Sequence, residues 1–185
     1  MRSPPILLVA AALAAAPADA QEPPFEPTGE IRFHASAGLG SGASFDETRI
    51  VGPAVNLTRR EDGSWAGDLA GQDVNLVGGE KKLSGPNVNL TFKQKGGKTE
   101  VEGLFYGERV RLSVDAKKIK GRYGRCSFDL TRKGPPIYRG DVGCMSQESR
   151  LPAAGKAAIE LIGKAAADVP PGPQVGLALV AILPR

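Results

Sequence analysis

An apolar residue, one spacer and a glycine recur at a nearly constant interval through the middle of this 185-residue chain. The glycines of successive copies lie 18, 18, 18 and 19 residues apart. The copies are Trp65-Ala66-Gly67, Leu83-Ser84-Gly85, Val101-Glu102-Gly103, Ile119-Lys120-Gly121 and Tyr138-Arg139-Gly140. A period of this length fits either two short antiparallel strands or one turn of a parallel solenoid. Turn signals occur twice per period, so we favour an antiparallel meander.

The turn signals separate into two sets, one for each end of the expected sheet. One end carries Gly78-Gly79, Gly96-Gly97, Asp115-Ala116 and Gly134-Pro135, and the other turns near Gly71, Pro86-Asn87, Gly107 and Gly124. The strands expected between them are 49–58, 64–69, 72–77, 81–85, 87–95, 98–106, 108–115, 117–123, 125–132 and 136–144. A first strand at residues 31–35 precedes them, and the Gly- and Ser-rich residues 38–44 are predicted to form a flexible loop.

Strict alternation assigns the two faces of these strands. Val110, Leu112 and Val114 lie on one face, and the residues between them lie on the other. The repeat glycines share the apolar face, where a missing side chain lets a sheet coil tightly. A closed or nearly closed barrel would also remove the exposed edges of a long meander. We therefore expect a mainly β, glycine-rich antiparallel meander, barrel-like, with one C-terminal α-helix and a final strand.

The C-terminal region changes composition after Arg150. Residues 153–168 are alanine-rich, with apolar residues at helical spacing, and predict one amphipathic helix. Residues 174–183 are apolar on both faces and predict a buried strand that closes the sheet. An outer-membrane β-signal is the alternative for these last residues, but the basic outer faces of the strands disfavour it because lipid-facing positions must be apolar.

The N-terminal residues have the form of a secretory signal peptide. Arg2 supplies the positive region, an apolar stretch follows, and Ala18-Asp19-Ala20 resembles a cleavage site. We expect a signal peptide at residues 1–20, a proline-rich lead-in at 21–28, the β domain at 29–150, and the helix and closing strand of that domain at 151–185. The protein is thus expected to be exported, either periplasmic or secreted, from a bacterial source.

Two cysteines fit an oxidising compartment. Cys126 and Cys144 are one period apart and would lie at similar heights on nearby strands, which predicts a disulfide. A metal pair or a reactive thiol are the alternatives. Further soft ligands are scarce, because His34 is the single histidine of the chain.

Residues suited to catalysis are few. His34 falls on the outer face of an early strand, and no serine sits in a Gly-x-Ser-x-Gly turn. Glu100 and Glu102 face the side that carries Arg109 and Arg111, so cross-strand ion pairs account for them. We therefore expect a protein that is not an enzyme, with no cofactor and no metal.

A basic face is the better candidate for function. Residues 81–139 contain fifteen Lys and Arg and five Asp and Glu. The outward-pointing cations of three successive strands would form one patch, called here the basic face: Arg109, Arg111, Lys118, Lys120, Arg122 and Arg125. Such a patch can attract anionic polysaccharide, lipopolysaccharide or a membrane surface, although a solvated, aggregation-resistant face is an equally ordinary explanation. Apart from Tyr106, aromatic side chains for base stacking are missing, so no specific nucleic-acid partner is expected.

Two functional classes follow. The first is an exported, non-catalytic, β-rich binding or envelope-associated module that contacts anionic partners through the basic face. The second is a small-barrel carrier of a hydrophobic small molecule, similar to lipocalins in outline only. Trp65 does not lie in that family's Gly-x-Trp motif. The sequence leaves both a small-molecule ligand and the oligomeric state open.

Overall fold

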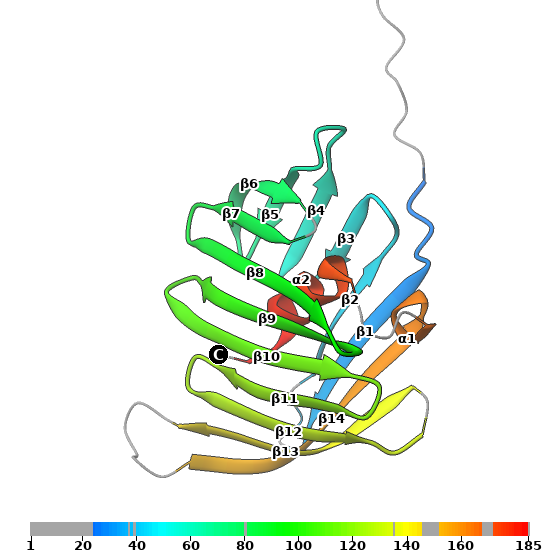
Figure 1. Ribbon diagram of the computed structural model, residues 1–185, viewed down its shortest axis with the longest axis vertical. Coiled ribbons are helices and arrows are strands. Elements are labelled where there is room, and N and C mark those ends of the chain that lie inside the picture. Colours follow the sequence, from blue (N-terminus) through cyan, green and yellow to red (C-terminus); the bar gives the residue numbers. More distant parts are fainter. Residues whose placement is uncertain are drawn as a thin grey trace, which may run out of the picture.

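Strands that follow one another in the sequence pair side by side, and the last strand pairs with the first, so the sheet closes (Figure 1). The computed structural model describes residues 24–36, 38, 40–79, 81–134, 136–145, 152–167 and 172–184. Within these residues, fourteen antiparallel strands form the barrel. They are β1 Gly29–Ala35, β2 Gly40–Phe45, β3 Arg49–Gly52, β4 Val55–Arg59, β5 Trp65–Leu69, β6 Gln72–Gly79, β7 Lys82–Gly85, β8 Val88–Lys95, β9 Lys98–Phe105, β10 Glu108–Asp115, β11 Lys118–Tyr123, β12 Cys126–Arg132, β13 Ile137–Met145 and β14 Pro152–Gly163. The predicted fold class, a mainly β antiparallel barrel with a C-terminal helix, is confirmed.

The predicted meander agrees with the structure from β5 to β13, and it differs in two places near the start of the chain. Residues 49–58 form not one strand but two, β3 and β4, because a turn at Pro53-Ala54 folds them into a hairpin. The expected loop at residues 38–44 is wrong over most of its length, because residues 40–45 form strand β2. Its glycines permit this, since Gly40 and Gly42 pair with the backbone of β1 and need no side-chain packing.

Apolar side chains fill the inside of the barrel, and charged side chains cover the outside. On β10, Val110, Leu112 and Val114 are at most 2% exposed, whereas Arg109 and Arg111 are exposed. The same alternation recurs on β8, β11 and β12. The two faces of the sheet therefore lie as the sequence predicts.

The repeat glycines occupy inward positions on alternate strands. Gly121 on β11 lies between Leu112 on β10 and Phe128 on β12, and both of these side chains are buried. Its φ is 143°, and a Cβ atom there would overlap the carbonyl oxygen of Arg111. Gly103 on β9 has a φ of 144° and would overlap Asn89 in the same way. Only glycine tolerates this backbone at this separation. The 18-residue period therefore marks positions where the backbone of a neighbouring strand lies too close for a side chain.

The C-terminal helix and strand occur in the opposite order from the prediction. A helix was expected at residues 153–168, but residues 152–163 form β14, which pairs with both β1 and β13 and closes the barrel. Residues 174–183, expected to be a strand, lie almost entirely in helix α2, Pro173–Ile182, after the short helix α1, Lys164–Ala167. Alanine-rich residues 153–168 have high helix propensity, but the two open edges of the sheet demand a partner, and this requirement prevails.

Helix α2 lies within the barrel, surrounded by strands (Figure 1). Residues Val175, Leu177, Ala178, Leu179, Val180 and Ile182 are at most 5% exposed. A Cβ atom at Gly176 would come within 3.0 Å of the Phe92 ring on β8, so the helix packs closely on the wall. The Gln174 side-chain amide donates a hydrogen bond to the carbonyl oxygen of Asp46, which anchors the start of α2 to the turn between β2 and β3. No helix of the described residues is both long enough and apolar enough to cross a membrane.

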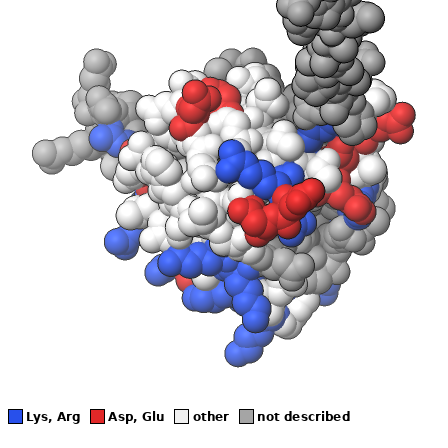
Figure 2. Space-filling view, turned by 90° about the horizontal axis from the view of Figure 1, so that it is seen from above, with Lys and Arg blue, Asp and Glu red and all other residues white. Residues whose placement is uncertain are grey.

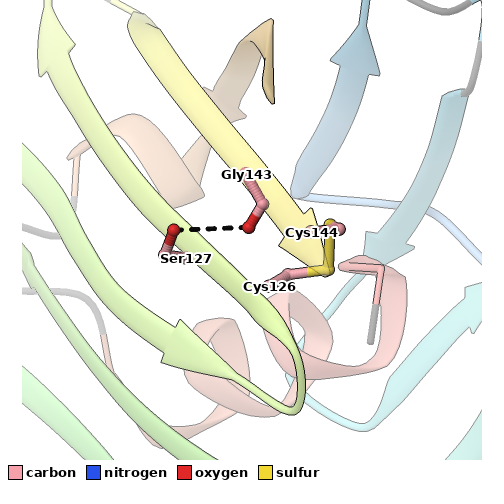
Figure 3. The surroundings of a disulfide bond; sticks show 4 residues. All are labelled: Cys126, Ser127, Gly143 and Cys144. Carbon is pink, nitrogen blue, oxygen red and sulfur yellow. Dashed lines mark hydrogen bonds between the residues drawn. A yellow bond between two sulfur atoms is a disulfide. The ribbon is translucent and has the colours of Figure 1, made fainter. Parts of the chain in front are cut away.

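The predicted disulfide is confirmed. Cys126 on β12 and Cys144 on β13 are direct cross-strand partners with a Cα–Cα distance of 4.0 Å and an S–S bond of 2.06 Å (Figure 3). Beside it, the Ser127 hydroxyl donates a 3.3 Å hydrogen bond to the carbonyl oxygen of Gly143. A disulfide is consistent with an exported protein. The expected signal peptide at residues 1–20 lies outside the described residues.

Candidate binding surface on the outer wall

All six residues of the basic face are exposed on the outside of the barrel. Arg109 and Arg111 belong to β10, Lys118, Lys120 and Arg122 belong to β11, and Arg125 lies in the turn that leads to β12. Adjacent strands bring these side chains together because outward positions on one strand lie opposite outward positions on the next. The structure thus places the predicted residues on one continuous part of the wall.

Two arginines meet at the centre of the basic face. Arg111 lies directly opposite Arg122 on β11 and directly opposite Glu102 on β9. The Nε atom of Arg111 is 3.6 Å from a carboxylate oxygen of Glu102, and the Nζ atom of Lys93 is 2.8 Å from the other oxygen. The hydrogen bond and the charge of Lys93, followed by the charge of Arg111, lower the pKa of the Glu102 carboxyl. Glu102 therefore stays ionised and partly balances Arg111, while Arg122 faces a like charge.

Two other acids near the basic face, Asp129 and Glu100, have lysine partners. The Nζ atom of Lys120 is 3.6 Å from Asp129, its cross-strand partner on β12. Glu100 pairs with Lys98 at 2.6 Å, and this hydrogen bond and charge raise the pKa of Lys98. The expectation of cross-strand ion pairs here is confirmed for Arg111 and Glu102, whereas Glu100 pairs along its own strand.

Four cations of the basic face form no ion pair within the described part of the chain: Arg109, Lys118, Arg122 and Arg125. Arg109 lies opposite Leu104, which is 48% exposed, and Arg122 has Ser127 as its second neighbour. Figure 2 shows one group of Lys and Arg along the lower left border of the view, while other Lys and Arg lie beside Asp and Glu nearer the centre. Unpaired cations are the groups best able to bind an added anion, because no protein carboxylate has to be displaced.

The wall around Arg109 and Arg122 is hollowed. One depression of about 570 Å³ has Lys120, Arg122, Ser127 and Asp129 on its sides. Two smaller depressions, of about 250 and 240 Å³, continue it over β9 and β10 and share Arg111 with each other. Four of the six basic-face residues, Arg109, Arg111, Lys120 and Arg122, therefore line these three connected hollows.

The structure also brings together a cationic hollow that the sequence did not reveal. His34 on β1, Arg139 on β13 and Lys156 on β14 line a depression of about 420 Å³ beside Ser36. His34 is exposed on the outer face, as predicted. Alternation alone puts His34 and Arg139 outside, but their proximity depends on β14 lying between β1 and β13. Residues 153–168 were expected to be helical, so the sequence did not predict that His34 and Arg139 lie close together.

The described residues contain no cluster of three or more His, Cys, Asp and Glu that could hold a metal ion. Tyr106, the aromatic residue considered for stacking, is half-buried and donates a 2.6 Å hydrogen bond to the carbonyl oxygen of Leu69. Its ring also packs edge-on against Phe105, with centroids 5.1 Å apart, which leaves it poorly placed to stack on a ligand.

Comparisons with protein-family models, with curated proteins and with solved structures find no match to this chain.

Proposed function

We propose that this protein is an exported, non-catalytic binding module of the cell envelope that contacts an anionic partner through the basic face. The observation that carries the proposal is the direct opposition of Arg111 and Arg122 on the outer wall. A surface that serves only solubility gains nothing from two like charges in cross-strand positions, because that arrangement destabilises the sheet. Anionic polysaccharide, lipopolysaccharide phosphates and anionic membrane share the chemistry that would neutralise the pair.

The four cations without an ion pair in the described residues supply the contacts. Replacing Arg109, Lys118, Arg122 and Arg125 with Gln removes four charges and leaves no carboxylate without its partner. A matched control carries Gln at Arg59, Arg60, Lys81 and Lys82, which are exposed and lie outside the basic face. Both variants have the same net charge, so a difference between them measures the location of the charges.

The test is retention on heparin and on vesicles of anionic lipid over a salt gradient. Wild-type retention is expected to fall steeply with salt, because binding releases counterions and the field of the patch is screened. The basic-face variant is expected to elute well before the control variant. Equal elution of the two variants would refute the proposal, since net charge alone would then explain retention.

The carrier of a hydrophobic small molecule is the alternative function. Helix α2 occupies interior space that such a ligand would need, and this weighs against a carrier. Native mass spectrometry of protein purified from its source tests it directly, since a carrier retains a bound small molecule.

A further inference from the structure

We infer that the binding surface is a furrow that crosses seven strands of the outer wall, from β9 to β14 and on to β1, and that its ligand is a linear acidic polysaccharide. The inference rests on the proposed function and names the class of partner. It also adds Arg139, Lys156 and His34 to the binding residues.

The depressions follow the line of the repeat glycines. Gly103 lies in the smallest hollow, Gly121 lies in the next two, and Gly140 lies in the hollow with His34. All three occupy inward positions with no side chain, so the backbone itself forms the floor. The side chains of Leu112 and Phe128, which also contribute to the floor, are at most 2% exposed. The furrow therefore has a backbone floor and charged sides.

Cross-strand rows relate the hollows to one another. The first three hollows share lining residues. The fourth shares none with the third, and the two are linked by the ion pair of Asp141 and Lys156, whose Oδ1 and Nζ atoms are 2.5 Å apart. Glu102, Arg111 and Arg122 form one row on β9 to β11, and the row continues on β12 with Ser127. A second row runs from Lys120 through Asp129 and Asp141 to Lys156 on β14. Adjacent strands are about 4.8 Å apart, so seven strands give a furrow roughly 30 Å long. This length suits an extended polymer and far exceeds a single small anion.

The furrow carries charges of both signs. Its cations are Arg109, Arg111, Lys120, Arg122, Arg139 and Lys156, and its carboxylates are Glu100, Glu102, Asp129 and Asp141. A polysaccharide with carboxylate groups and free hydroxyls matches both kinds of side chain, since cations bind its carboxylates and protein carboxylates accept hydrogen bonds from its hydroxyls. A polyphosphate or an anionic membrane lacks this density of hydroxyl donors, so it offers fewer hydrogen bonds to offset the repulsion from the four carboxylates.

Shape and composition argue against the other polyanions. A flat membrane cannot reach cations set in a furrow that curves around a barrel wall. A single-stranded nucleic acid needs exposed aromatic rings, and the one aromatic residue that lines these hollows, Phe128, is buried. An acidic sugar chain fits the described furrow without either requirement.

The test uses galacturonate oligomers of increasing length as probes, with inorganic polyphosphate of equal charge and phosphatidylglycerol vesicles as comparisons. Affinity by calorimetry is expected to rise with oligomer length until the oligomer spans the furrow, and then to level off. Polyphosphate of equal charge is expected to bind about tenfold more weakly. Equal or tighter binding of polyphosphate or vesicles would overturn the inference.

Variants that add bulk inside the furrow distinguish binding within the furrow from attraction by charge alone. Ser127→Phe and Ala154→Phe place a ring on exposed outward positions in the furrow without changing charge, and Asn75→Phe is the matched control on β6. Both furrow variants are expected to lose about tenfold in affinity for long oligomers, and the control to lose none. Circular dichroism verifies that each variant is folded.

The outcomes distinguish the furrow from the broader proposal. If the Gln variant of the basic face loses binding while both ring variants retain it, the anionic partner stands and the furrow is wrong. Arg139→Gln supplies an independent readout. It is expected to lower the affinity for long oligomers about threefold and to leave the affinity for short oligomers unchanged. An equal change in affinity for oligomers of every length would show that the hollow at His34 is not part of the binding surface.

Discussion

Arg111 on β10 and Arg122 on β11 lie directly opposite each other, and both side chains point outward from the barrel. The Arg111 side chain is 76% exposed and has Glu102 as a partner on the other side, whereas Arg122 forms no ion pair among the described residues. Cross-strand pairs of like charge destabilise a sheet by a few tenths to about 1 kcal/mol. The pair therefore costs stability in a fold that could have avoided it.

Removing one member of the pair should stabilise the protein and weaken binding together. Arg122→Thr is expected to raise the free energy of unfolding by a few tenths of a kcal/mol up to about 1, since it ends the repulsion and places a strand-forming residue on β11. Urea denaturation gives the change. Arg59→Thr on β4 is the control, because its cross-strand partner is Trp65 and not a cation. A destabilised Arg122→Thr would show that the arginine pair carries no cost.

Substitution of a repeat glycine should be severe. Gly121→Ala is expected to destabilise by about 3 kcal/mol or more, because a φ of 143° is strained for alanine and the new Cβ atom would overlap a neighbouring backbone carbonyl. Gly79→Ala is the matched control, since a Cβ atom there meets nothing within 4 Å. We expect it to change stability by less than about 0.5 kcal/mol. Similar losses at both sites would contradict the role of the repeat glycines as positions of close backbone approach.

The disulfide should contribute stability through the unfolded chain. It closes a loop with a sequence separation of 18, for which the chain-entropy relation gives about 3 kcal/mol. The double variant Cys126→Ala/Cys144→Ala is therefore expected to unfold at a lower urea concentration. Wild-type protein treated with reductant serves as the control and should lose a similar amount. If reduction leaves the midpoint unchanged, the bridge is not formed in the purified protein.

Helix α2 should behave as part of the core. Leu177 is fully buried, so Leu177→Ala is expected to cost about 2–5 kcal/mol in unfolding free energy. Leu104→Ala removes the same atoms from a residue that is 48% exposed and should cost well under half as much. A loss of less than about 1 kcal/mol for Leu177→Ala would mean that α2 leaves the barrel easily, and it would strengthen the carrier alternative.

Acid should weaken the turn that holds the start of α2. Burial raises the pKa of the Asp46 carboxyl, but hydrogen bonds from Thr48 and the Arg49 backbone, together with the Arg49 charge, lower it overall below 3.8. A lowered folded-state pKa gives stability that is fully present above the unfolded value and lost as pH falls through the folded one. Asp46→Asn is therefore expected to cost about 1 kcal/mol at pH 7.

The pH dependence of that cost provides the check. Thermal melts between pH 7 and pH 2 should show the gap between wild type and Asp46→Asn narrowing below about pH 4. Comparison with the variant removes the contribution of other carboxyls, such as Glu102, whose pKa is also lowered. A gap that stays constant across this range would show that Asp46 acts through packing and not through its charge.

Local pattern was sufficient for most of the wall. Alternation fixes which side chains of β10 point outward. The basic face could therefore be predicted without knowing which strands lie beside those that carry it. Turn residues and the 18-residue period placed the hairpins, and the spacing of Cys126 and Cys144 indicated the bridge. These features depend on residues close in sequence, where backbone geometry leaves few alternatives.

The furrow required the closed barrel, because its far end joins β1 to β13 through β14. His34 and Arg139 are more than a hundred residues apart in sequence, and each lies opposite Ala158. Nothing in the local sequence around either residue indicates the other. The strand between them, β14, was not predicted because it is rich in alanine. Alanine favours a helix in isolation but can form a strand when two sheet edges need a pairing partner.

The sequence by itself determined the strands from β5 to β13, the two faces of the sheet, its period and its disulfide, since each follows from short-range alternation and turn chemistry. Tertiary structure decided the order of the last strand and helix. Residues 174–183 are apolar on every side, a pattern that fits a buried strand or a buried helix equally well. Once β1 and β14 pair, no sheet edge remains to satisfy the backbone of another strand. Only a helix, which forms its own backbone hydrogen bonds, can fill the interior of a closed barrel.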